Sequence, residues 1–222
     1  MKVINDIAII GAGGLGREVQ WLIERINAEE ETWNIIGYID DGHPQGEVID
    51  GYPVLGGTDY LIGYKEPLSV VCAIGKAKTR KRIIERLAEN QALHYPNLID
   101  PNAVMSHSAV IGEGNIICSG AVISVDLEIG NFNVIDWNGT VGHDASLGSF
   151  ITLYPNVNVS GAVKIGNCVE LGTGTQVIQG KKIAEEVIIG AGSVVIRDIE
   201  EGGTYVGVPT RKIKGRLIEG CK

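Results

Sequence analysis

The sequence lacks the features of several large protein classes. None of its four cysteines forms a CxxC pair or a Cys/His spacing typical of metal sites, so we expect reduced thiols and no bound metal. Positive charge is scarce: 19 Lys and Arg against 27 Asp and Glu give a net charge of −8, which argues against nucleic acid or anionic membranes as partners. The longest apolar run near the start, Ile7 to Ile10, is too short for a membrane span or a signal sequence. We therefore expect a cytoplasmic protein with one large or two small domains.

Isoleucine, leucine and valine, in contrast, recur with a period of six. Fifteen consecutive hexads carry one of these residues at the same position. These three types fill roughly a third of the segment, so chance would give such a run with odds on the order of one in ten million. The repeated residues are Ile111, Ile117, Ile123, Ile129, Ile135, Val141, Leu147, Leu153, Val159, Ile165, Leu171, Val177, Ile183, Ile189 and Val195.

This period predicts a hexapeptide-repeat β-helix. Six residues match neither a 3.6-residue helix nor a long two-period strand, but they match a chain that turns a corner after each short strand. With three strands per coil, fifteen hexads give about five coils, which stack to roughly 24 Å at a strand spacing of about 4.8 Å. The aliphatic residue is expected to point inward, and the glycine that often follows it is expected to relieve the corner backbone.

The first hundred residues predict a separate, small parallel α/β domain that is Rossmann-like. Expected strands at 6–10, 35–39 and 68–74 alternate with helices after Gly16 and at 78–90. Pro96 and Pro101 bracket the passage into the repeat. We place the boundary near Ile99, which gives domains of residues 1–98 and 99–222.

Gly11, Gly13 and Gly16 form a GxGxxG motif between the first expected strand and helix. Such a loop turns backbone amides and a helix N-terminus toward a phosphate. Asp40, 24 residues past Gly16, ends the second expected strand and is a candidate acceptor for a ribose or a base edge. The alternatives are a glycine-rich turn without a ligand and a nicotinamide dinucleotide site. Three evident strands make only half of the usual dinucleotide fold, so a nucleotide-sugar fits better.

His143 is the strongest candidate for a catalytic residue. It stands two residues after Val141, in a column that is otherwise mostly polar and therefore expected to face outward. Asp144 follows it and can orient the ring, and Asp126 lies one coil below as a second carboxylate. The alternative is an ordinary solvated histidine. His107, two coils lower, is about 10 Å away and too far to share a proton.

A basic tail follows the repeat in this acidic protein. It is a candidate clamp for the phosphates of a coenzyme, and the alternative is solvated surface charge. The tail consists of Arg211, Lys212, Lys214 and Arg216.

Over nearly its whole length the chain resembles two-domain bacterial sugar acyltransferases of the left-handed β-helix superfamily. This family includes sialic-acid O-acetyltransferases and N-acetyltransferases of UDP- or dTDP-linked 4-amino-6-deoxy sugars. The resemblance is carried by Gly11-Ala-Gly-Gly-Leu-Gly16-Arg-Glu, Gly37-Tyr-Ile-Asp40-Asp41, Ala73-Ile-Gly75, Val141-Gly-His143-Asp144 with Leu147-Gly148, Gly190-Ala-Gly-Ser-Val-Val195 and Val206-Gly-Val-Pro209-Thr-Arg-Lys212.

The resemblance implies a left-handed helix and a homotrimer with active sites between adjacent subunits. It implies that His143 is the general base and that Asp144 supports it. The positions that match nucleotide-sugar contacts are Gly13, Gly14, Leu15, Asp40, Asp41 and Gly75, and those that match coenzyme A contacts are Thr152, Thr173 and Ala191. Three positions depart from the family: Leu15 and Thr152 stand where histidine is found, and Asp136 where asparagine is common.

The sequence therefore predicts an acetyl-CoA-dependent N-acetyltransferase that acts on a UDP- or dTDP-linked 4-amino-6-deoxy sugar in surface-glycan synthesis. It needs no metal and forms no acyl-enzyme. Within the same class, O-acetylation of a sialic acid or another sugar hydroxyl is the alternative. From a different class, the chain is a non-catalytic scaffold that binds a nucleotide-sugar, in which case His143 is dispensable.

Overall fold

The computed structural model describes residues 4–213. Contacts divide the chain into two compact units. One runs to Pro101 and includes Glu113–Ile117, and the other comprises Asn102–Gly112 and the chain from Cys118 onward. In the described residues no helix is both long and apolar enough to cross a membrane.

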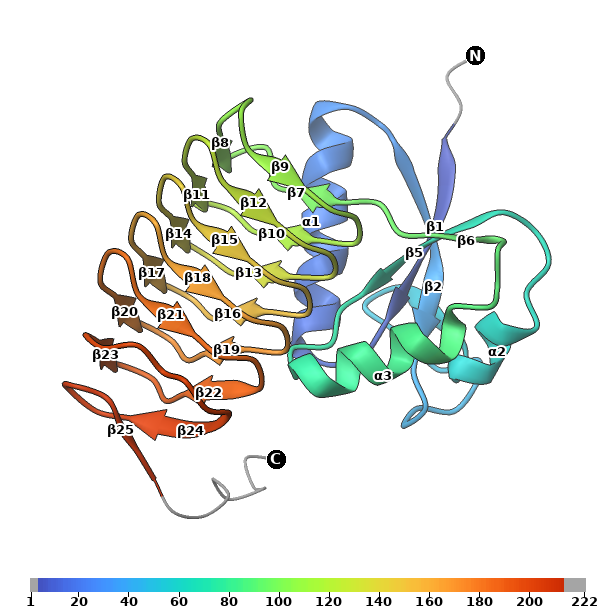
Figure 1. The fold of residues 1–222 in the computed structure, drawn as a ribbon. Coiled ribbons are helices and arrows are strands. Elements are labelled where there is room, and N and C mark those ends of the chain that lie inside the picture. The colour runs from blue at the N-terminus through green and yellow to red at the C-terminus, as the bar shows by residue number, and fades with distance from the viewer. Residues whose placement is uncertain (1–3, 214–222) are drawn as a thin grey trace. The chain divides into compact units, whose positions relative to one another are not determined.

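The N-terminal unit is an α/β fold around a six-stranded sheet of order β3-β4-β2-β1-β5-β6 (Figure 1). Strand β1 pairs in parallel with both β2 and β5, and only β3 runs antiparallel to its neighbour. The elements are β1 (Asn5–Ile10), α1 (Gly14–Glu29), β2 (Trp33–Ile39), β3 (Val48–Ile49), β4 (Tyr52–Gly56), α2 (Thr58–Ile62), β5 (Leu68–Cys72), α3 (Ala77–Leu87) and β6 (Leu93–His94).

The strand order reverses at β1, and this reversal positions the predicted nucleotide site. The chain crosses from β1 to β2 on one side and later returns to β5 on the other side of β1. In open parallel sheets, ligands bind at such a switch point, outside the carboxyl ends of the strands. The glycine motif follows β1 and Gly75 follows β5, so both lie at this edge of the sheet.

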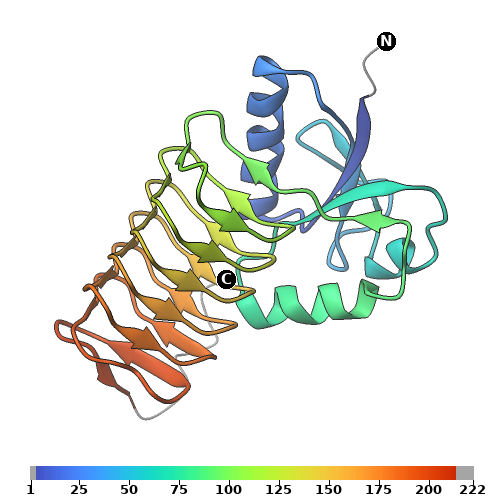
Figure 2. The ribbon, with the colours of Figure 1, turned by 45° about the horizontal axis from the view of Figure 1, so that its top comes forward.

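From Leu98 onward the described chain winds into a left-handed parallel β-helix with three sheets, and two of its short strands belong to the first compact unit. Short strands repeat along each face, as the turned view in Figure 2 also shows. The first face holds β7 (Leu98–Ile99), β10 (Ile116–Ile117), β13 (Val134–Ile135), β16 (Thr152–Leu153), β19 (Glu170–Leu171), β22 (Val187–Ile189), β24 (Gly203–Val206) and the antiparallel β25 (Arg211–Lys212). The second face holds β8 (Val104–Met105), β11 (Val122–Ile123), β14 (Thr140–Val141), β17 (Asn158–Val159), β20 (Gln176–Val177) and β23 (Val194–Val195). The third face holds β9 (Val110–Ile111), β12 (Glu128–Ile129), β15 (Ser146–Leu147), β18 (Lys164–Ile165) and β21 (Lys182–Ile183).

The eighteen parallel strands make six coils, so the expected count of about five is slightly low. The missing coil lies mainly at the start, where Ile99 and Met105 keep the register but Met105 breaks the Ile/Leu/Val pattern. The prediction of inward-facing aliphatic residues is confirmed. From Ile117 to Val195, every member of the repeat is at most 4% exposed. Each such side chain contributes roughly 1.5–3 kcal/mol through removal from water.

The corners obey a different rule from the one expected. We expected the glycine after each aliphatic residue to relieve the corner, but these glycines do not have positive φ. The left-handed conformation falls two residues later, with φ between 52° and 60° at nine non-glycine residues of the repeat, including Asp126 and Asp144. The glycines are needed for space instead: a Cβ on Gly142 would lie 2.5 Å from the amide nitrogen of Gly161 in the next coil.

Candidate functional site

His143 lies at the corner between β14 and β15. Its side chain is 52% exposed, and its Nδ1 is 2.7 Å from Oδ2 of Asp144. An ionised carboxylate only accepts hydrogen bonds, so on a neutral ring the proton sits on Nδ1 and Nε2 keeps its lone pair. The pair therefore presents an unprotonated nitrogen, which is what a general base requires.

The solenoid backbone fixes Asp144. Its φ is 58°, a left-handed conformation that aspartate tolerates better than most residues, and its amide donates to the carbonyl of Val125 in the coil below at 3.2 Å. The second expected carboxylate does not join the pair. Asp126 is exposed, its amide donates to Oγ of Ser108, and no hydrogen bond between described residues links its side chain to His143. A single carboxylate thus orients the imidazole.

Gly161 provides the surface on which the His143 ring lies. It stands 18 residues after His143, one coil higher, and a Cβ there would be 2.6 Å from both Cε1 and Nε2 of the ring. The carbonyl of His143 also accepts the amide of Ala162 at 2.7 Å. Among the described residues, the Gly161 amide has no backbone acceptor. An N–H donor therefore lies beside the imidazole, and sequence reasoning missed this residue although its spacing from His143 equals one coil.

Asp136 is an unusual buried carboxyl group in the same unit. It is 8% exposed, and its carboxyl group accepts the amide of Trp137 at 2.7 Å and a hydrogen bond from the Cys118 side chain. Burial raises the pKa of Asp136 above its ordinary value, and the two hydrogen bonds only partly oppose this shift. The departure from the family's asparagine thus places a titratable group where a neutral amide is common.

The residues matched to coenzyme A contacts differ in exposure. Thr173 and Ala191 are exposed and lie in adjacent coils, as the bond from the Gly192 amide to the Thr173 carbonyl (2.8 Å) shows. Thr152 is only 1% exposed in β16. Thr152 thus belongs to a strand and not to the corner column of Thr173 and Ala191, and of the three only the two corner residues offer an open surface.

The described part of the basic tail lies on β25. Arg211 and Lys212 are exposed, while Lys214 and Arg216 lie outside the described residues. The Lys212 ammonium is 2.9 Å from the Glu201 carboxylate and 5.8 Å from the centroid of the Tyr205 ring. The Glu201 contact raises the pKa of Lys212 and lowers that of Glu201. Arg211 is thus the freer cation of the two.

The glycines after β1 have two separate roles. Gly11, at φ 98°, and Gly16 are required by close packing, because a Cβ would lie 2.7 Å from the Ile74 side chain and 1.9 Å from the Gly11 carbonyl oxygen, respectively. Gly13 and Gly14, in contrast, have nothing within 4 Å of an added Cβ. They begin α1, which has neither a capping side chain nor an acidic residue in its first turn. The open glycines and the uncompensated helix N-terminus favour an anionic group at this position. Leu15, beside them, is half-buried.

The acidic residues after β2 hold backbone groups of the same unit. The Asp40 carboxylate accepts the amides of Ala12 (2.8 Å) and Gly42 (2.7 Å), so it fixes the glycine loop. Asp41 accepts both the amide and the hydroxyl of Thr58, at 2.7 and 2.9 Å, and thereby caps α2. Both carboxylates therefore hold the loops of the predicted nucleotide site in place, in addition to being possible acceptors for a ligand.

The strand-end loop after β5 is held by a buried cation. The Arg80 guanidinium, 1% exposed, donates to the carbonyls of Ile74 and Gly75. The sequence pattern predicted the helix that contains Arg80, but this residue was assigned no role. In residues 4–213, no group of three His, Cys, Asp or Glu side chains is placed to hold a metal ion.

Comparisons with known proteins agree with both units. Residues 6–87 match the model of the PglD N-terminal domain. The acetyltransferase domain of PglB from Neisseria gonorrhoeae, also solved in complex with acetyl coenzyme A, superimposes with a TM-score of 0.85. It is 32% identical, and the match covers 94% of this chain and 100% of that domain.

Two further relatives carry a nucleotide-linked sugar, one as a bound ligand and one in its name. PerB from Caulobacter crescentus, solved with CoA and GDP-perosamine, has a TM-score of 0.83 and 31% identity, over 96% of this chain and 99% of that one. The UDP-N-acetylbacillosamine N-acetyltransferase of Bacillus subtilis (strain 168) is 33% identical over 123 residues. That match spans about half of each chain, 51% of both.

Proposed function

The chain belongs to the sugar N-acyltransferase family of the hexapeptide-repeat superfamily, and on this basis we propose that it acetylates the amino group of a nucleotide-linked 4-amino-6-deoxy sugar with acetyl-CoA. The observation that carries the proposal is the exposed His143–Asp144 pair at 2.7 Å, which leaves Nε2 as a base. Production of a surface-glycan precursor in the cytoplasm follows as its setting, and the buried thiols of Cys72, Cys118 and Cys168, none of which forms a disulfide with another described residue, agree with a reducing compartment.

The reaction needs one proton acceptor and one oxyanion donor. The sugar amine attacks the thioester carbonyl, and Nε2 of His143 takes the proton that the nitrogen loses as the C–N bond forms. The Gly161 amide, beside the ring, donates to the oxyanion of the tetrahedral intermediate. The C–S bond then breaks, and the protonated imidazole returns the proton to the leaving thiolate. Asp144 stabilises the imidazolium during the step.

The N-terminal unit would bind the nucleotide-sugar. Gly13, Gly14 and the N-terminus of α1 provide space and amide donors for its diphosphate. Gly75, held through Arg80, and Leu15 would form the walls, while Asp40 and Asp41 keep the loops in place. UDP and dTDP are the expected carriers, although the relative solved with GDP-perosamine makes GDP a necessary member of any substrate panel.

Coenzyme A would lie along the coils beyond His143. The exposed Thr173 and small Ala191 leave a path for the pantetheine arm, with Thr152 at its lower end and Arg211 and Lys212 near a phosphate. We expect a homotrimer, since the second wall of each site would come from a neighbouring subunit.

The direct test is a thiol-release assay with acetyl-CoA and a panel of 4-amino-6-deoxy sugars linked to UDP, dTDP or GDP. Rapid thiol release that depends on one such sugar supports the function. Release only with sialic acid or another sugar that lacks an amine would favour O-acetylation. If the chain binds a nucleotide-sugar but releases no thiol with any acceptor, it is a binding scaffold.

A further inference from the structure

The third face of the β-helix carries a lysine pair that the mechanism does not use. Outward positions on this face are occupied in sequence by Val110, Glu128, Ser146, Lys164 and Lys182. Lys164 and Lys182 are direct partners in neighbouring parallel strands, so their backbones lie about 4.8 Å apart. Like charges in this arrangement repel one another and destabilise the sheet.

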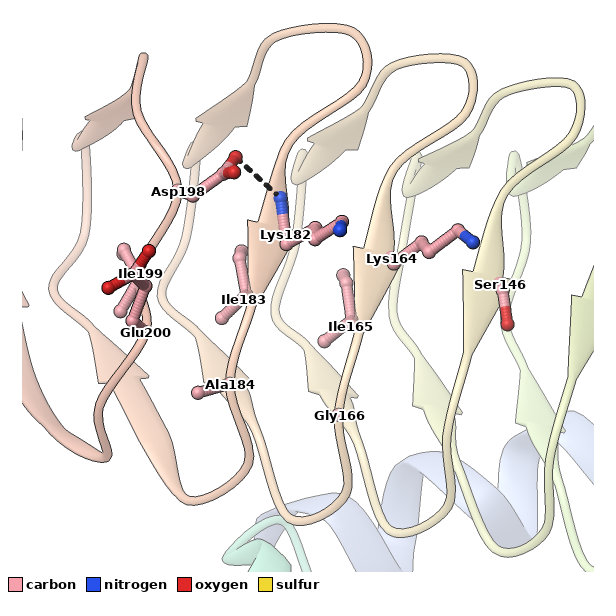
Figure 3. A pocket seen from close by; sticks show the side chains of 10 residues that line it. All are labelled: Ser146, Lys164, Ile165, Gly166, Lys182, Ile183, Ala184, Asp198, Ile199 and Glu200. Carbon is pink, nitrogen blue, oxygen red and sulfur yellow. Dashed lines mark hydrogen bonds between the residues drawn. The ribbon is translucent and has the colours of Figure 1, made fainter.

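An open groove of about 450 Å³ surrounds this pair, between Ser146 at one end and Asp198 and Glu200 at the other (Figure 3). Both lysine side chains extend toward Ser146, away from the two carboxylates. One carboxylate oxygen of Asp198, Oδ1, already accepts a hydrogen bond from the backbone amide of Lys182 at 3.0 Å. Among the described residues, neither ammonium group forms an ion pair. Neither lysine is therefore paired, although Asp198 and Glu200 line the opposite end of the same groove.

The groove adjoins the catalytic corner. Ser146 is three residues beyond His143, and Lys164 is three residues beyond Gly161 in the next coil. Three residues of corner and two coils separate His143 from Lys182, so their Cα atoms are at most about 14 Å apart, given rises of at most about 3.3 Å per residue and about 4.8 Å per coil. In coenzyme A the pantetheine arm separates the thioester from a diphosphate on this scale. A thioester at His143 thus allows the diphosphate to reach the lysines. Thr173 and Ala191 follow strands of the first face, so the pantetheine arm would meet them on the neighbouring subunit of the expected trimer.

We propose that Lys164 and Lys182 form a diphosphate-binding site for coenzyme A. This inference rests on the proposed function and deepens it. It assigns the 5′-diphosphate to the lysine pair and leaves the 3′-phosphate to Arg211 and Lys212. Glu128, one strand beyond Ser146, and Glu200 at the opposite end limit the site to the lysine half of the groove.

Calorimetry on Lys164→Met, Lys182→Met and the double variant tests the site, with Lys181→Met as a control that removes the same charge next to the groove but does not line it. We expect each groove variant to weaken acetyl-CoA binding about 10-fold at low salt, and less at high salt, while Lys181→Met changes little. The groove variants should lose as much affinity for acetyl-dephospho-CoA, which lacks the 3′-phosphate, as for acetyl-CoA. Their affinity for acetyl-pantetheine, which lacks the diphosphate and the 3′-phosphate, should equal that of the wild type. Arg211→Ala with Lys212→Ala should show the opposite selectivity for the 3′-phosphate.

Three outcomes would overturn the assignment. Unchanged acetyl-CoA affinity in the double variant would mean that the lysines are merely solvated. If the groove variants lost affinity only for UDP or dTDP, titrated in the same way, the groove would belong to the nucleotide-sugar. An equal loss in Lys181→Met would reveal a non-specific charge effect. Inorganic pyrophosphate separates this proposal from the proposed function. If the wild-type protein binds no acetyl-CoA, the function fails, and a lysine-dependent affinity for pyrophosphate still decides whether the site exists.

Discussion

Replacing Gly161 with alanine should disable the base without unfolding the protein. The new Cβ would lie 2.6 Å from Cε1 and Nε2 of His143, whereas ordinary contacts begin at 3.4 Å, so the ring must move by about 1 Å. A displacement of this size in a catalytic group costs about 100-fold, or about 2.7 kcal/mol in the activation barrier. The backbone of Gly161 is not in the left-handed region and accepts alanine, and the half-exposed ring can move into solvent at little cost to stability.

The assay is kcat by thiol release at saturating substrates, together with the thermal midpoint. We expect kcat to fall about 100-fold with a Tm near that of the wild type. The control is the same substitution in a His143→Ala background, where it should have almost no further effect because the group that it displaces is gone. A Gly161→Ala enzyme within about threefold of wild-type kcat would refute the reasoning, as would an undiminished loss in the His143→Ala background.

Three further predictions concern other parts of the chain. Asp40→Ala should raise KM for the nucleotide-sugar and leave KM for acetyl-CoA nearly unchanged, because it releases the Ala12 amide in the N-terminal unit; equal losses for both substrates in steady-state kinetics would point to misfolding or to a different site. The pKa of Asp136 is raised on folding, so the native state binds the proton more tightly and stability falls as the pH rises from the ordinary value of 3.8 through the raised pKa. Asp136→Asn should therefore melt at a higher temperature than the wild type at pH 7 and lose this advantage at low pH. If the variant and the wild type melted at the same temperature at pH 7 as well as at low pH, the burial assigned to Asp136 would be contradicted. Light scattering should give the mass of three chains, and a monomer at concentrations where the enzyme is active would exclude the trimer.

The fold was predictable where one residue type recurs with a strict period. The aliphatic series defined the β-helix because each member fills the same inward position. The corners were not predictable from composition. Phe150 and Ala162 adopt the left-handed conformation, which their side chains disfavour, and their amides donate to carbonyl groups of the coil below, which hold them there. In the N-terminal unit, β1, α1, β2, β5 and α3 were predicted, whereas β3, β4, α2 and β6 were not. The two-residue β3 and β6 are too short to leave a pattern.

In the candidate site, too, contacts between sequence neighbours were predictable and contacts between distant residues were not. His143 and Asp144 are adjacent in sequence, so their 2.7 Å contact was predictable. Asp40 was expected to face a ligand, but both of its oxygens accept amides of its own loops, a pairing across 28 residues in the case of Ala12. Gly161 and Lys164 were missed because their importance depends on which side chain lies one coil away. Contacts between coils arise at a spacing of 18 residues, and they show in the sequence only if that spacing is examined for every chemically active position.

The most direct test of the account is NMR identification of the product that wild-type and His143→Ala enzymes form from acetyl-CoA and a nucleotide-linked 4-amino-6-deoxy sugar. The account predicts a single acetyl group on the C4 nitrogen, formed by His143→Ala at least 100-fold more slowly although the variant remains folded. An acetyl group on a hydroxyl, or near-normal turnover by folded His143→Ala, would contradict it.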